Sequence, residues 1–222
     1  MRLAFDISSS VWSCLLGGID IEGKKVEFEG KSVQVNTAGY GYEKVINLMV
    51  SALQEVGVTP MDCLLVPEGL NSKAPRLMID KLYKAGRGRP QECYVEFQKL
   101  RDNLIDVWRS MGAIVVSQDN VEADDVLAWL AENMREDMMI VTNDGDMTVL
   151  NGRNKHGAVI SVRIDGVVGQ NKYGMFPFKY ITLYKSWVGD TSDKIKGIKG
   201  FGDAAWRELD TRFGEKGMDY LI

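Results

Sequence analysis

The chain has 222 residues, of which 45% are hydrophobic and 26% are charged, so it is long enough for one globular domain with a substantial core and has neither a disordered nor a fibrous composition. The formal net charge of −4 excludes a uniformly basic nucleic-acid-binding surface, although a local basic region could still attract a polyanion. Three widely spaced cysteines and one histidine, His156, argue against a structural zinc site, a disulfide framework and a Ser-His-Asp triad.

Along the chain, short apolar runs with strand character alternate with segments of helical periodicity. The expected strands are residues 2–7, 62–67, 113–117, 138–142 and 158–164, with a hairpin within 19–36, and the expected helices are 42–56, 97–108, 122–134, 178–188 and 203–213. This alternation predicts an α/β fold with a mixed, mostly parallel central sheet, helices on both faces, and a single domain spanning residues 1–222. No segment has the length of a membrane span and no leader is apparent, so we expect a cytoplasmic protein with reduced thiols and no membrane contact.

Acidic residues follow three of the expected strands directly. Asp6 lies at the end of the first strand, Glu68 follows the second, and Asp144 and Asp146 follow the fourth. Because ligand sites of parallel sheets lie outside the carboxyl ends of the strands, we expect these acids to share one edge of the sheet. Carboxylates gathered there repel one another unless a divalent cation binds between them, so the pattern predicts a metal site.

Two acidic runs allow a second interpretation. In Glu122-Ala-Asp124-Asp125, acids at a helix start also complement the helix dipole, and Glu122 converges with Asp124 only if it precedes the first helical turn. In Asp144-Gly-Asp146, the two carboxylates point the same way if the chain is extended, whereas the residues from Asn143 to Gly145 are equally typical of a turn.

Residues 73–89, which we call the basic segment, carry six basic residues against one acid, Asp80. The basic residues are Lys73, Arg76, Lys81, Lys84, Arg87 and Arg89, and Tyr83 lies among them. A charge run is ordinarily a solvated helix face, but lysine and arginine also neutralise phosphates and tyrosine can stack on a base.

A second phosphate-binding pattern runs from Gly189 to Gly202, which we call the glycine–lysine turn. Asp190 and Asp193 open it, and lysines alternate with glycines after them. Glycines let backbone amides approach a phosphate closely, but small glycine turns between helices are common, so both interpretations stay open.

Taken in order over nearly the whole chain, these motifs resemble those of the 5′-nuclease family, which includes flap endonucleases, phage 5′–3′ exonucleases and the amino-terminal nuclease domains of bacterial DNA polymerase I. The similar stretches are Asp6, Lys73-Ala-Pro with Arg76, Tyr83-Lys84-Ala-Gly-Arg87, Val121 to Leu127, Thr142 to Met147, and Gly189 to Gly202. Glu68 stands where the family usually has Asp, and the sequence ends soon after the second helix of the expected DNA-binding element. These 222 residues contain no polymerase region, so we expect the stand-alone phage-type enzyme to be the nearer analogue.

The resemblance implies a structure-specific 5′ nuclease that uses two Mg²⁺ (or Mn²⁺) ions and leaves 5′-phosphate and 3′-hydroxyl ends. Around the first ion it implies Asp6, Glu68, Glu122, Asp124 and either Asp144 or Asp146, and around the second Asp125, Asp144, Asp146, Asp190 and Asp193. Lys84 and Arg87 are the implied catalytic cations. The implied DNA-binding residues are Lys73, Arg76, Lys81, Tyr83 and Arg89, in an arch over about residues 70–110, and Lys196, Gly197, Lys199, Gly200 and Gly202, in a helix–three-turn–helix element over about 186–214.

The resemblance also implies the partners of such an enzyme. The substrate is expected to be DNA with a free 5′ end, a flap or a nick, with RNA–DNA hybrid as a further substrate, and the protein is expected to act as a monomer in a bacterial or phage-infected cell. A K⁺ ion is expected at the helix–three-turn–helix element. Two alternatives remain: a PIN-like ribonuclease, which has a similar acidic edge but lacks the glycine–lysine turn, and a DNA-structure-binding protein without catalytic activity.

Overall fold

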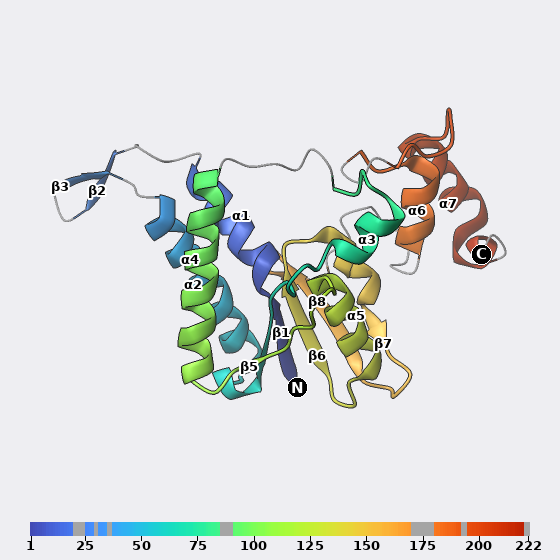
Figure 1. Ribbon diagram of the computed structural model, residues 1–222. Coiled ribbons are helices and arrows are strands. Elements are labelled where there is room, and N and C mark those ends of the chain that lie inside the picture. Colours follow the sequence, from blue (N-terminus) through green and yellow to red (C-terminus); the bar gives the residue numbers. More distant parts are fainter. Residues whose placement is uncertain are drawn as a thin grey trace.

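The computed structural model describes residues 1–19, 25–28, 31–34, 37–84, 91–169, 180–191 and 195–219. In this part of the chain the central sheet has the strand order β5-β4-β1-β6-β8-β7, and β9 pairs with β8 (Figure 1). The parallel strands are β1 (Arg2–Asp6), β4 (Cys63–Val66), β5 (Ile114–Val115), β6 (Met138–Thr142) and β8 (Val159–Ile164), and the antiparallel ones are β7 (Gly152–Arg153) and β9 (Val167–Val168). The predicted mixed, mostly parallel sheet is confirmed.

Helices α1 (Ile7–Ile19), α2 (Thr37–Val56) and α4 (Gln91–Ser110) cover one face of this sheet, and α5 (Ala123–Asn133) covers the other. The other helices of the described residues are α3 (Ala74–Ile79), α6 (Ile181–Val188) and α7 (Asp203–Met218), together with the 3₁₀ turns η1 (Pro60–Asp62) and η2 (Gly145–Leu150). A separate antiparallel hairpin of β2 (Lys25–Phe28) and β3 (Lys31–Gln34) confirms the hairpin expected within residues 19–36. None of these helices is both long and apolar enough to cross a lipid bilayer.

Alternation of side chains along the strands divides the core in two. In β1, Leu3 and Phe5 pack against α1, α2 and α4, while Ala4 between them faces α5 and η2 on the other side. All three residues are fully buried. Period-two alternation in a strand with apolar residues at every position therefore produces two hydrophobic layers, as expected for a parallel sheet covered on both faces.

Helix α1 was not among the expected elements. Its buried side chains Ile7, Val11 and Leu15 recur every four residues, which places them on one face toward the sheet. Serines at positions 8–10 weaken the helical signal because serine favours caps and turns over helix interiors. The helix begins directly after Asp6 and so determines what surrounds that carboxylate.

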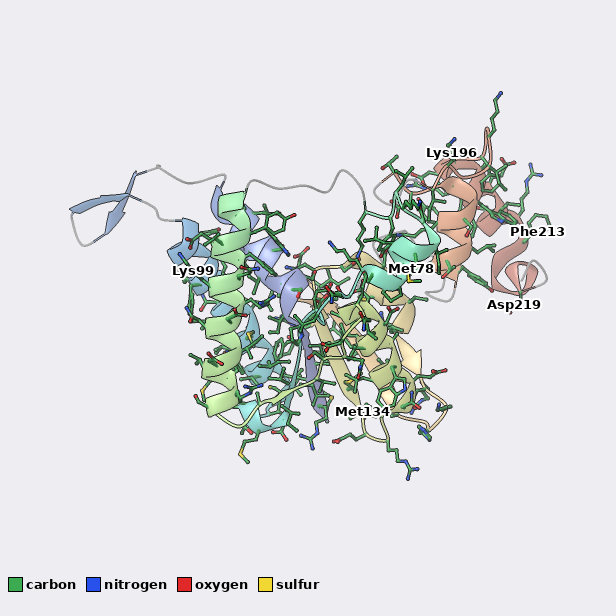
Figure 2. All side chains as sticks on the ribbon, in the orientation of Figure 1. Met78, Lys99, Met134, Lys196, Phe213 and Asp219 are labelled. Atoms are coloured by element: carbon green, nitrogen blue, oxygen red, sulfur yellow. The ribbon has the colours of Figure 1, made fainter. Side chains whose placement is uncertain are left out.

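Helices α6 and α7 lie to one side of the main body, beyond α3 (Figure 1). They enclose a small core of their own in which Trp206 is buried and its ring contacts those of Tyr184 and Trp187 edge-on, at centroid distances of 5.4 and 6.2 Å. Helix α6 lies against η2 of the main body. Figure 2 shows Lys196 near the outer end of this C-terminal pair, with Phe213 and Asp219 on the side away from α3.

Candidate active site

The parallel register brings the predicted acids to one edge of the sheet. Asp6 ends β1 and lies opposite Val66, the last residue of β4, two residues before Glu68. On the other side of β1, strand β6 ends at Thr142, two residues before Asp144. The carboxyl ends of β1, β4 and β6 therefore lie side by side, and the prediction of a shared edge is confirmed for Asp6, Glu68 and Asp144.

A cavity of about 380 Å³, which we call the acidic cavity, opens at this edge. Four acids line it, from four different elements or the loops that follow them: Asp6, Glu68, Asp124 and Asp144. The remaining lining side chains are polar, basic or aromatic: Ser8, Ser9, Trp12, Ser72, Lys73, Lys84, Tyr94, Phe97, Gln98 and Arg101. The cavity thus combines carboxylates, cations and an aromatic wall from α1 and α4.

Asp6 lies at the bottom of this arrangement and is 2% exposed. The backbone N–H of Ser9, in the first turn of α1, donates to its Oδ1 at 3.0 Å, and the hydroxyl of Thr142 donates to its Oδ2 at 2.8 Å. The pKa of Asp6 is raised from 3.8 to about 7, mainly by burial and also by the carboxylates of Asp124 and Asp144, which together outweigh the lowering effect of these two hydrogen bonds.

Asp124, in the first turn of α5, has the same kind of surroundings. Burial raises its pKa to about 6, the carboxylates of Asp144 and Glu68 also raise it, and Lys84 and Arg76 lower it. Crowded carboxylates with raised pKa values repel one another when ionised, and a hard divalent cation with oxygen ligands relieves that repulsion. The donor set of the acidic cavity therefore fits Mg²⁺ or Mn²⁺.

Glu68 is fixed between two helices despite its extra methylene relative to aspartate. Its Oε2 accepts the backbone N–H of Ala123, the first residue of α5, at 3.2 Å, and its own N–H donates to the hydroxyl of Ser8 at 3.2 Å. The side chain thus caps α5 and faces the acidic cavity. This geometry gives Glu68 a structural contact in addition to its predicted role as a ligand.

Glu122 precedes the first turn of α5 and has extended backbone angles, φ −74° and ψ 153°, which answers one question that the sequence left open. Its carboxylate is 1% exposed and is held by three side chains of the basic segment. Tyr83 donates to Oε2 at 2.8 Å, Lys84 donates to Oε1 at 3.0 Å, and Arg76 forms an ion pair with the same group. Arg76 also binds both oxygens of Asp125, at 2.7 and 2.9 Å. The basic segment therefore neutralises Glu122 and Asp125 directly.

Asp144 and Asp146 do not follow each other in an extended chain. Asp144 is the N-cap of η2, and its Oδ1 accepts the backbone N–H of Asp146 at 2.9 Å. As a result their carboxylates have different surroundings: Asp144 lines the acidic cavity, whereas Asp146 pairs with Lys185 of α6. Of the two interpretations that the sequence left open, the turn is the one that describes this stretch.

Asp146 and Asp190 do not line the acidic cavity, and both form ion pairs with Lys185. Lys185 Nζ lies 2.5 Å from Asp190 Oδ2, just after α6. Among the described residues, no three Asp, Glu, His or Cys side chains are grouped closely enough to enclose an ion as they stand. The ligand roles of the individual acids therefore stay predictions, and Asp193, Arg87 and Arg89 lie outside the described residues.

The glycine–lysine turn connects α6 and α7 through close backbone contacts. Asp190 and Ile195 exchange two backbone hydrogen bonds of 2.8 Å, and the N–H of Ile198 donates to the carbonyl of Trp187 at 2.7 Å. Gly197 has φ 65°, and a Cβ there would lie 2.6 Å from the carbonyl carbon of Val188. Lys196, Lys199, Gly200 and Gly202 are exposed on this turn, as is Lys81 in the basic segment.

A family model described as the 5′-3′ exonuclease N-terminal resolvase-like domain matches residues 30–174. The chain belongs to the 5′-nuclease family. DNA polymerase I of Thermus thermophilus is 30% identical to it over 193 residues, which are 83% of this chain and 21% of the polymerase. The 5′-3′ exonuclease of Mycoplasma pneumoniae is 28% identical over 184 residues, which are 76% of this chain and 57% of that enzyme.

Solved structures show the same fold. The 5′-exonuclease of phage T5, solved with zinc ions, superposes with a TM-score of 0.66 at 16% identity, covering 96% of this chain and 75% of the phage enzyme. A T5 flap endonuclease solved with DNA and metal ions gives a TM-score of 0.61 at 15% identity. This 5′-nuclease chain spans about a fifth of the polymerase relative and just over half of the mycoplasma exonuclease.

The α1 and α4 side of the acidic cavity was not predicted from the sequence. The Trp12 and Phe97 rings stack there, 4.3 Å apart at 11°, and Tyr94 meets Trp12 edge-on at 5.2 Å. Arg101 lies over Phe97, with its guanidinium carbon 5.6 Å from the ring centroid. The amphipathic pattern of α4 predicts a buried face, but the sequence does not show that this face borders the acidic cavity, because that depends on the position of α1.

Proposed function

We propose that this chain is a divalent-metal-dependent 5′ nuclease, a flap endonuclease or 5′–3′ exonuclease that hydrolyses DNA phosphodiesters and leaves 5′-phosphate and 3′-hydroxyl ends. The observation that carries the proposal is the acidic cavity, in which Asp6, Glu68, Asp124 and Asp144 face Lys84 at the carboxyl edge of the sheet. Carboxylates beside a cation suit a metal-bound phosphodiester better than a neutral substrate.

We assign the acids of this cavity to two Mg²⁺ or Mn²⁺ ions. Asp6, Glu68, Asp124 and Asp144 would hold the first, with Glu122 joining once it exchanges its present cations, and the second would lie toward Asp125, Asp146, Asp190 and Asp193. Such ions supply an activated water and neutralise the charge that develops on the scissile phosphate and the leaving oxygen. The hydrogen bonds from Ser9 and Thr142 would keep the Asp6 carboxylate oriented toward the ion.

Lys84 and Arg87 would stabilise charge on the phosphate. The ammonium of Lys84 binds Glu122 at 3.0 Å and lines the cavity that holds Asp124, so a phosphate in the cavity lies within reach of it. Arg76 would be released from Glu122 when a metal ion takes its place beside that carboxylate. Ion exchange of this kind would couple the basic segment to loading of the site.

The remaining parts would bind DNA. Residues of about 70–110 would form an arch in which Lys73, Arg76, Lys81, Tyr83 and Arg89 contact a single-stranded 5′ end. Residues of about 186–214 would form a helix–three-turn–helix element that holds the duplex backbone through Lys196, Gly197, Lys199, Gly200 and Gly202, with K⁺ on backbone carbonyls. The exposed lysines and the close backbone turn at Gly197 support that assignment.

We further propose that residues 1–222 act as one domain and as a monomer, in the cytoplasm of a bacterial or phage-infected cell, on DNA with a free 5′ end, flap or nick and on RNA–DNA hybrid. All three cysteines are free thiols, which accords with a reducing compartment.

The test is digestion of end-labelled flap, nicked and blunt DNA duplexes and of single-stranded RNA, with Mg²⁺ and with excess chelator. Mg²⁺-dependent cleavage at the 5′ flap or end, with ligatable 5′-phosphate products, supports the proposal. Cleavage confined to RNA would replace it with a ribonuclease, and tight DNA binding without cleavage would replace it with a structure-binding protein.

A further inference from the structure

Lys185 joins the C-terminal helices to the acidic edge of the sheet. Its Nζ lies 2.5 Å from Asp190 Oδ2 and forms a second ion pair with Asp146. Asp146 belongs to η2 of the main body, whereas Asp190 lies two residues after the end of α6. The side chains of Lys185 and Asp190 are only 12% and 13% exposed, whereas that of Asp146 is 41% exposed, so the ion pair with Asp190 is the one shielded from water.

The two acids that it binds are among those assigned above to the second metal ion. One lysine therefore supplies a single positive charge at a place where a divalent ion would supply two. A lysine ammonium is a compact charge on a flexible stem, so it can withdraw without moving the helix that carries it. Ammonium and metal would compete for the same carboxylate oxygens.

We propose that Lys185 is a positioning residue that substitutes for the second metal ion in the metal-free protein and is displaced when that ion binds. The inference rests on the proposed function, because it takes Asp146 and Asp190 as metal-binding acids. Two consequences follow from charge alone. Lys185 lowers the affinity of the second ion, and it stabilises the metal-free protein by offsetting repulsion between the carboxylates.

The same contact couples metal binding to the C-terminal helices. Helix α6 lies against η2, and the Lys185–Asp146 ion pair crosses that junction. Displacement of the lysine would remove this cross-link, and Asp146 and Asp190 would then hold the ion in its place. The C-terminal pair would therefore be held by a protein cation before metal loading and by the metal after it.

The experiment is calorimetric titration of the full chain with MnCl₂, together with thermal unfolding in chelator, for the wild type, Lys185→Met and Lys185→Arg. Lys99→Met is the matched control, because Lys99 pairs with Glu96 at 3.1 Å on the exposed face of α4, away from the acidic edge (Figure 2). An opposite charge at ion-pair distance shifts ionisation equilibria by about one to three powers of ten, so Lys185→Met should bind the weaker of two Mn²⁺ ions roughly tenfold more tightly.

In chelator Lys185→Met should unfold at a lower temperature than the wild type. Lys185→Arg should return the manganese affinity toward the wild-type value, and Lys99→Met should leave it unchanged. A purely structural role would not tighten metal binding. Should the methionine variant fail to fold, Lys185→Gln, which keeps a polar end without the charge, gives the same readout.

Two results would overturn the inference: manganese binding by Lys185→Met that is unchanged or weaker than in the wild type, or the same tightening in Lys99→Met. In either case the proposed function would still stand, provided that the wild type binds two ions. If the wild type itself binds no manganese, the proposed function fails, and the inference fails with it.

Discussion

The hydroxyl of Thr142, the last residue of β6, donates a 2.8 Å hydrogen bond to the carboxylate of Asp6, the last residue of the neighbouring strand β1. The same hydroxyl accepts the backbone N–H of Asp144 at 3.0 Å. One buried oxygen thus fixes the orientation of one predicted metal ligand and the backbone of another. Thr142 therefore links the carboxyl end of β1 to the chain that follows β6.

Replacing Thr142 by valine should weaken divalent metal binding. Valine keeps the volume and removes both hydrogen bonds, so Asp6 loses a contact that favours its ionised form, and the N–H of Asp144 loses its acceptor. We expect a several-fold increase in the dissociation constant for Mn²⁺ and a loss of about 1 kcal/mol in the free energy of unfolding, measured by calorimetry and denaturant titration. Thr142→Ser, which keeps the hydroxyl, is the control; equal affinities for both variants would count against the role of the hydroxyl.

The stability of the metal-free protein should fall as pH rises. Burial raises the pKa of Asp6 from 3.8 to about 7, so the folded state holds a proton there that the unfolded state releases. The stabilisation is complete below pH 3.8 and is lost as pH rises through 7. Asp124, with its pKa raised to about 6, acts in the same direction.

Urea unfolding in chelator between pH 5 and 8 measures this slope, and Asp6→Asn, which carries no charge at any pH, should reduce it. Saturating Mg²⁺ should reverse the trend, because ion binding requires the ionised carboxylates. An identical slope in wild type and Asp6→Asn would show that Asp6 is already ionised in the folded protein.

Removing the ammonium of Lys84 should slow cleavage without emptying the metal site. Lys84 faces the acidic cavity, and its charge is proposed to act on the phosphate. We expect Lys84→Ala to lower the single-turnover rate by roughly a hundredfold or more, with Mn²⁺ stoichiometry unchanged in a parallel titration. Lys99→Ala serves as the control. A rate equal to that of the wild type would remove Lys84 from the chemistry.

A methyl group at Gly197 should disrupt the turn between α6 and α7. A Cβ there would lie 2.6 Å from the carbonyl carbon and oxygen of Val188, and the residue has φ 65°, so backbone atoms must move. We expect Gly197→Ala to lower the free energy of local unfolding by about 2 kcal/mol or more. The fluorescence of Trp187 and Trp206, which lie in the core between α6 and α7, monitors this unfolding. At Gly202 a Cβ meets nothing within 4 Å, so Gly202→Ala should unfold like the wild type. Equal effects of the two changes would contradict this steric explanation.

The positions that the sequence predicted well are those set by periodicity along one element. Asp6, Glu68 and Asp144 follow apolar strands, and parallel pairing alone brings such positions to one edge. The two layers of core on either side of β1 follow from the same period-two rule. Strand β6 was predicted with its observed bounds, because the apolar run Met138–Thr142 is flanked by polar residues on both sides.

What the sequence did not provide depends on contacts between distant elements. The pairing of Lys185 with Asp146 requires α6 to lie against η2, and no local pattern encodes that placement. The ion pairs of Arg76 and Lys84 with Glu122 depend likewise on how the basic segment folds back over the N-terminus of α5. In η2, the side chain of Asp144 captures the backbone of Asp146, and such capping competes with the extended conformation that alternation had suggested.

The most direct test of the account is the anomalous diffraction of a crystal soaked in manganese. We predict a peak among the carboxylates of Asp6, Glu68, Asp124 and Asp144, and a second one toward Asp146 and Asp190 with the ammonium of Lys185 displaced. Fully occupied manganese elsewhere on the protein, with no anomalous density at the carboxyl edge of the sheet, would contradict a metal-dependent nuclease site in this cavity.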